Sequence, residues 1–94
     1  MFSGIISTEQ RIETLSDNIS NYKFVYILAF SAGEDNVRGS SLVLKDIFKK
    51  KGSITVCWFS GSPTAIAVYY NDDTHISVKT ENNAVNNLHL YGMK

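Results

Sequence analysis

Cysteine and proline are almost absent from this sequence, with one of each among 94 residues. A single cysteine, Cys57, excludes an internal disulfide framework and any metal site built from several cysteines. There is also no excess of charge, because nine lysines and arginines balance nine aspartates and glutamates. This balance argues against a nucleic-acid groove or an anionic-membrane surface, both of which need a positive excess.

Long apolar runs are missing as well. No stretch approaches the roughly 18–20 apolar residues that a membrane-spanning helix needs, so we expect no membrane insertion. The first residues carry no basic segment, and their apolar stretch is interrupted by Ser7, Thr8 and Glu9. That pattern argues against a signal peptide.

What the sequence does contain favours strands. Five tyrosines, five phenylalanines and one tryptophan accompany many valines, isoleucines and threonines, which are residues enriched in β-sheets. Asparagine, serine, glycine and aspartate supply the turns. With 94 residues, of which 44% are apolar, we expect one small domain over residues 1–94. The core of such a domain is thin and supplies only about 3–5 kcal/mol of net stability.

The strongest predicted strand covers residues 22–30 and is apolar on both faces after Lys23. Such a strand is central in a sandwich or lies against a neighbouring subunit. Residues 16–21 form a dense turn cluster, and residues 46–52 fit either a helical turn capped by Gly52 or a strand end. About seven short strands with regular turns predict an all-β fold, an antiparallel β-sandwich of the jelly-roll type.

Two hairpins between residues 53 and 80 suggest a register. A three-residue loop at 61–63 places Trp58 opposite Ile66, and another at 71–73 places Val68 opposite Ile76. Both loops put one apolar set on one face, which supports the register because a one-residue slip would scatter that set. The set is Ile54, Val56, Trp58, Ile66, Val68, Tyr70, Ile76 and Val78. We therefore expect Trp58 in the core.

The opposite face of this meander is smaller and half polar. It carries Thr55, Cys57, Phe59, Ala65, Ala67, Tyr69, His75, Ser77 and Lys79. The predicted register sets Tyr69 opposite His75, beside a turn with Asn71, Asp72 and Asp73. An aromatic side chain with hydrogen-bonding neighbours suits a sugar, so these five residues form the candidate ligand site. The alternative is that this face is a subunit interface, since small residues let another chain approach closely.

Catalytic chemistry finds little support. Cys57 and His75 fall on one face, but no third group orients them, and a lone buried cysteine explains Cys57 equally well. Asp72 and Asp73 are explained as turn residues that cap the backbone, not as metal ligands. The lysines at 49–51 are typical of a solvated turn. We therefore expect no catalytic residues, no metal and no cofactor.

Several segments carry a resemblance to a known group of proteins. They are the leading SGI, ETLSDNISNYKFVYILAF, RGSSLVL, VCWFSGSPTAIAVYYNDDTHISV and NNLHLYGMK. In this order they resemble a β module of bacteriophage and prophage tail proteins. The resemblance implies a tail-fibre, tailspike or baseplate-associated module, often the C-terminal piece of a longer trimeric protein.

The resemblance also implies a function and a place. Such modules bind a host cell-surface glycan or protein, or else trimerise or cap the fibre without a ligand, and they carry no general set of catalytic residues. The expected location is the virion tail, after synthesis in the bacterial cytoplasm. A small core and neutral charge favour an oligomer. The expected homotrimer takes its number from the resemblance alone, and a dimer satisfies the physics equally well.

Overall fold

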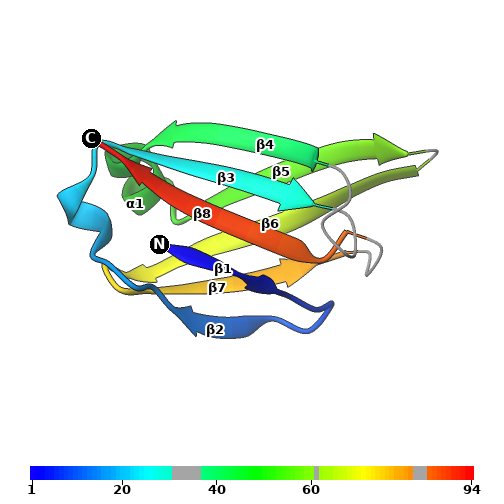
Figure 1. Ribbon diagram of the computed structural model, residues 1–94, viewed down its shortest axis with the longest axis horizontal. Helices are drawn as coiled ribbons and strands as arrows, with labels where there is room; N and C mark the ends of the chain where they lie inside the picture. Colours follow the sequence, from blue (N-terminus) through cyan, green and yellow to red (C-terminus); the bar gives the residue numbers. More distant parts are fainter. Residues whose placement is uncertain (31–36, 61, 82–84) are drawn as a thin grey trace.

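Two antiparallel β-sheets, stacked as two layers, make up the fold (Figure 1). The computed structural model describes residues 1–30, 37–60, 62–81 and 85–94, and for residues 37–38, 56–60 and 62–64 it describes the backbone alone. In chain order the elements are β1 (Phe2–Ile5), β2 (Arg11–Thr14), the 3-10 helix η1 (Ile19–Asn21), β3 (Phe24–Phe30), β4 (Val37–Leu44), α1 (Lys45–Lys51), β5 (Ser53–Ser60), β6 (Ser62–Asp72), β7 (His75–Thr80) and β8 (Asn87–Met93).

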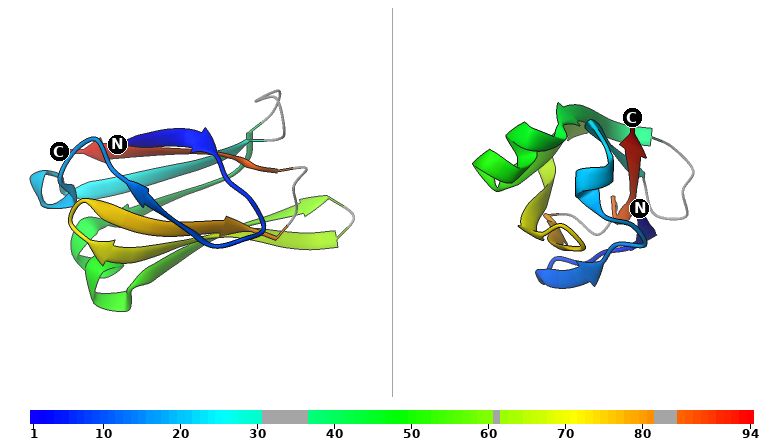
Figure 2. Two further views of the ribbon diagram at one scale, coloured as in Figure 1. Left: turned by 90° about the horizontal axis from the view of Figure 1, so that it is seen from below. Right: turned by 90° about the vertical axis from the view of Figure 1, so that its left-hand side faces the viewer.

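The two sheets are named after their long inner strands. The β3 sheet has the strand order β1-β8-β3-β4, and the β6 sheet has the order β2-β7-β6-β5. Figure 2 shows them as separate layers between which the chain crosses. The expected all-β sandwich is confirmed, with eight described strands where about seven were predicted. A jelly roll is not established by this order, in which β5, β6 and β7 follow one another as a meander within one sheet.

The hydrophobic core fills the space between the sheets. Along β3, Val25, Ile27 and Ala29 are fully buried and the residues between them are half-exposed, because side chains alternate between the faces of a strand. The other buried apolar side chains are Ile6, Leu15, Ile19, Phe48, Ile54, Ile66, Val68, Ile76, Val78, Val85, Leu88 and Leu90. Burial of each larger one contributes about 1.5–3 kcal/mol, so this layer holds the sandwich together.

The segment at 46–52, for which two conformations were considered, is the helix α1. Its end is set by Gly52, which has a left-handed φ of 83° and donates its N–H to the Phe48 carbonyl at 2.8 Å. Glycine adopts this conformation without the strain that a Cβ atom would bring. The helix turns Phe48 fully into the core, where its ring meets the edge of Tyr70 at 5.6 Å.

The predicted hairpin registers are wrong by two residues. Trp58 pairs with Thr64 and not with Ile66, because β5 and β6 remain paired as far as Ser60 and Ser62. The predicted three-residue loop therefore assumed too early an end to the ladder.

In the second hairpin, Val68 pairs with Val78 and not with Ile76, because the turn is tighter and β6 continues to Asp72, which pairs with His75. A shift by two residues keeps every side chain on its predicted face, unlike a shift by one. The five described aliphatic members of the predicted apolar set are accordingly buried. The side chains of Val56 and Trp58 lie outside the described ones.

One end of the β3 sheet is locked by a close contact. The ring of Tyr22 packs directly on Gly92, where an added Cβ atom would lie only 2.4 Å from a ring carbon. The Tyr22 hydroxyl donates a hydrogen bond to Asp17, and the Lys23 N–H donates to the Met93 carbonyl at 2.9 Å. These contacts join the turn before β3 to the end of β8.

Candidate functional site

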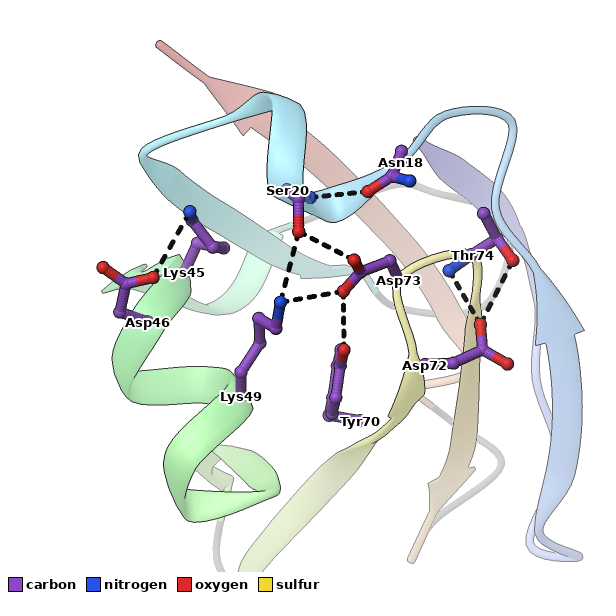
Figure 3. A network of polar contacts seen from close by, with 9 residues as sticks. All are labelled: Asn18, Ser20, Lys45, Asp46, Lys49, Tyr70, Asp72, Asp73 and Thr74. Atoms are coloured by element: carbon purple, nitrogen blue, oxygen red, sulfur yellow. Dashed lines mark hydrogen bonds and ion pairs between the residues drawn. The ribbon is translucent and has the colours of Figure 1, made fainter.

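The five candidate ligand residues lie where β6 turns into β7, and the structure divides them into two groups. The outer side of the β6 sheet, called the β6 face, presents the described side chains of Ile12, Thr14, Thr55, Ala65, Ala67, Tyr69, Asn71, His75, Ser77 and Lys79. Tyr69, Asn71, Asp72 and His75 belong to this face or its edge. Asp73 turns towards Lys49 of α1, away from Asp72 (Figure 3).

The expected pairing of Tyr69 with His75 is wrong. Tyr69 lies opposite Ser77, while His75 lies opposite Asp72, because a register shift between Tyr70 and Asp72 closes the hairpin early. The Nδ1 atom of His75 is 2.9 Å from Oδ1 of Asp72. Both residues remain on the same end of the sheet as Tyr69, but they form a pair of their own.

The polar groups of this end are held in fixed positions. Asn71 donates its Nδ2–H to Oγ of Ser77 at 2.8 Å, and Ser77 is buried. Asp72 accepts the backbone N–H of Thr74 at 2.8 Å, and this bond, followed by the contact with His75, holds the pKa of Asp72 below its ordinary value. The Asp72 carboxylate therefore stays charged and exposed at the edge of the β6 face.

Asp73 is the centre of a separate network (Figure 3). Its Oδ1 accepts the hydroxyl of Tyr70 at 2.5 Å and lies 3.0 Å from Nζ of Lys49, and its Oδ2 accepts the Ser20 hydroxyl at 2.8 Å. The Tyr70 hydrogen bond is the largest of the influences that lower the pKa of Asp73 to about 2, ahead of Ser20 and Lys49. The network ties α1, η1 and the β6–β7 turn together.

This network corrects the prediction that residues 49–51 are a solvated turn. Lys50 and Lys51 are exposed, but Lys49 is half-buried, pairs with Asp73, and lies 5.7 Å from the centre of the Tyr70 ring. Tyr70 was predicted only as a member of the apolar set, and Ser20 only as part of the turn cluster at 16–21, because their partners come from distant segments. The only available signal was the turn of aspartates beside a tyrosine.

The network stabilises the fold and contains no effective general base. The Asp73 hydrogen bond raises the pKa of Lys49, so the lysine stays protonated and cannot accept a proton from Ser20. Asp73, with a pKa of about 2, is likewise a weak base. Asp72, Asp73 and His75 do not converge on one point, and the described residues hold no group of three or more His, Cys, Asp or Glu side chains placed for a metal ion. The Cys57 side chain, considered with His75, lies outside the described ones.

A second surface was only half predicted. The outer side of the β3 sheet, called the β3 face, presents Phe24, Tyr26, Leu28 and Phe30 of β3, Leu42 and Leu44 of β4, and His89, Tyr91 and Met93 of β8. Sequence analysis found the two-sided apolar pattern of β3. It did not foresee that the strands on both sides would extend the same apolar surface, because strand neighbours follow from topology.

The described helices are too short to cross a membrane, α1 being the longer with seven residues. Comparison with family models, with curated proteins and with solved structures finds no match to this chain. The candidate sites are therefore supported only by the positions and contacts of the described residues.

Proposed function

We propose that this chain is a non-catalytic recognition module of a bacteriophage or prophage tail, located in the virion tail, and that its β6 face binds a host cell-surface glycan. The observation that carries the proposal is the placement of half-exposed Tyr69 beside Asn71, Asp72 and His75, whose side chains are held by their own hydrogen bonds. An aromatic ring can cover the apolar face of a sugar while fixed polar groups meet its hydroxyls.

Rigidity of the site supports the same proposal. The turn behind it is fixed by Asp73, which is bound to Lys49 of α1 and to Ser20 of η1. Groups that are already in place lose little conformational entropy on binding. One such platform per chain still binds weakly, and several copies on one fibre would raise avidity by roughly 10²–10⁴ if they engage together.

A glycan array of bacterial lipopolysaccharide oligosaccharides, followed by saturation-transfer NMR on the free oligosaccharides, tests this proposal. We expect binding that is lost in the double variant Tyr69→Ala/His75→Ala. The matched control is Tyr91→Ala/His89→Ala, which removes the same two residue types from the β3 face. Free oligosaccharides keep avidity out of the measurement. Loss in the control variant with retention in the first would move the glycan site to the β3 face and overturn the proposal.

The second candidate function is trimerisation or capping of a viral fibre without a ligand. It is favoured by the β3 face, whose large apolar side chains resemble an assembly surface more than a solvated one. The array separates the two functions, because an assembly module shows no glycan hit at any density.

A further inference from the structure

Rows of apolar side chains cross the β3 face from strand to strand. In one row, Tyr26 lies between Leu42 of β4 and Tyr91 of β8. In the row beside it, Phe24 lies between Leu44 and Met93. Cross-strand partners of this kind have neighbouring Cβ atoms, so these rows form one continuous surface.

Aromatic contacts extend this surface along β8. The ring of His89 meets the edge of Phe30 at 4.9 Å and stacks on Tyr91 at 6.2 Å. Aromatic residues and methionine are enriched at the centres of protein interfaces, whereas lysine and glutamate are depleted there. The described outward positions of β1, β3, β4 and β8 carry none of Asp, Glu, Lys or Arg.

Much of this surface is in contact with solvent in the single chain. Leu42 is 56% exposed, Tyr91 48% and Met93 45%. Figure 2 shows no described helix or strand over the outer side of the β3 sheet. Large contiguous apolar patches are uncommon on monomeric proteins and mark surfaces that another molecule covers. The β3 face is therefore a candidate docking surface.

Charge indicates which partner fits this surface. The described side chains of the face are uncharged, so they offer no complementarity to an acidic or basic partner, and the whole chain has a net charge of zero. Copies of the chain therefore do not repel each other. Among the described side chains, three lysines flank the row of Phe24 at one end of the face, namely Lys23, Lys45 and Lys94, and Lys45 is paired with Asp46 at 3.3 Å.

The size of the face suits a modest interface between two copies. Seven residues along β3 and four strands across give about 25 Å by about 20 Å, including side-chain width, or about 500 Å² on each copy. Two copies then bury about 1,000 Å² in total, which is near the lower limit for a specific interface. We expect a dissociation constant on the order of 1 μM.

We propose that the β3 face is covered by the β3 face of a second copy, in a two-fold dimer with the sheets packed face to face. A two-fold axis that lies between the two faces and perpendicular to β3 runs the β3 strands in opposite directions, and so places the three lysines of each copy at opposite ends. A parallel arrangement, including a three-fold one, gathers the lysines of all copies at one end. The charge distribution thus favours two copies over the three that the resemblance implies.

This inference rests on the proposed assembly function and is independent of the glycan proposal. The two use opposite faces of the sandwich. Leu42→Lys keeps oligosaccharide binding if only self-association fails, and Tyr69→Ala/His75→Ala keeps the dimer if only glycan recognition fails.

Light scattering on the purified chain across a hundredfold dilution around 1 μM tests the dimer. We expect twice the monomer mass at the high end, falling to the monomer mass on dilution. Leu42→Lys and Tyr91→Lys are expected to weaken the dimer at least tenfold. Ile12→Lys is the matched control, because Ile12 is 69% exposed but belongs to β2 of the other sheet. A monomer at all concentrations, a trimer, or equal dissociation by Ile12→Lys would overturn the proposal.

Oxidation of the unaltered chain by hydrogen peroxide gives a second measurement that does not depend on the fold of a variant. Met93 lies on the β3 face, and Met1 packs against the core at the edge of the sheet. We expect Met93 to oxidise several-fold more slowly at concentrations where the dimer forms, with Met1 as the internal reference. A Met93 rate that does not change with concentration would contradict the proposal.

Discussion

The two outer faces of this sandwich are built from strands with the same alternation and yet have opposite character. The β6 face carries small and polar side chains such as Ala67, Ser77 and Lys79, with Tyr69 as its described aromatic residue. The β3 face carries Phe24, Tyr26, Leu28 and Phe30 on one strand alone. Both sheets bury equally apolar inner faces, so the difference lies entirely in what each presents outward.

This difference changes the interpretation of small residues. Alanine, serine and threonine on the meander suggested close approach of another chain. In the structure most of the exposed large apolar side chains, such as Leu42 and Tyr91, lie on the other sheet, and the β6 face exposes Ile12 at its edge. Small side chains permit close packing but bury little area. Burying a large apolar side chain removes more surface from water and therefore contributes more free energy to association.

Adjacent residues of β3 give the sharpest test of the comparison. Ile27→Ala removes a fully buried side chain and should cost about 2–5 kcal/mol of unfolding free energy. Leu28→Ala removes an outward side chain, so we expect a change below about 1 kcal/mol in the monomer together with weaker self-association. Urea unfolding of both variants below the association range measures the two costs. Equal losses would mean that the two sides of β3 are alike.

Gly92→Ala tests whether the end of the β3 sheet is as tightly packed as its centre. The new methyl group would overlap the Tyr22 ring, and overpacking of this kind costs about 1–3 kcal/mol. Gly4→Ala is the matched control in β1, because its nearest neighbour is the tip of the Phe2 ring at 3.3 Å. Thermal unfolding of both variants should show a clear loss only for Gly92→Ala.

Acid affects the β6 side through Asp73. Its pKa is lowered from 3.8 to about 2 in the folded state, so the unfolded chain binds more protons between these values. Stability from Asp73 is therefore present above about pH 4 and is lost as the pH falls towards 2. Asp73→Asn should flatten this part of the melting-temperature profile, with Asp46→Asn as the exposed control. If the melting temperature of Asp73→Asn fell with pH as steeply as that of the unaltered chain, the network would not contribute to stability in acid.

The alternation of residues predicted most of the fold. The five described aliphatic members of the predicted meander set are buried, because each strand's alternation is local. The register failed where it depended on turn length, since Asp72 and His75 pair across a tighter turn than three residues allow. A turn of aspartates is compatible with several lengths, and the sequence does not rank them.

The candidate site was predicted in place but not in its contacts. Tyr69, Asn71, Asp72 and His75 do gather at one end of the β6 face, as their spacing indicated. Asp73 lies apart from these four residues because it binds Lys49 and Ser20, which are far away in sequence. Phe48 was likewise missed in the core, since one helical turn gives too little periodicity to reveal its buried side.

The pairing of β1 with β8 has a consequence for how the chain folds. Phe2 lies beside Leu90, so this ladder joins two segments that are far apart in the sequence. Contacts between residues so distant in sequence raise the contact order and slow folding, because a long loop must close first. The β5–β6–β7 meander consists of local hairpins and needs no such closure. We therefore expect the meander and the β3–β4 pair to form early, with β8 joining β1 and β3 last and the β3 face completed only at that step.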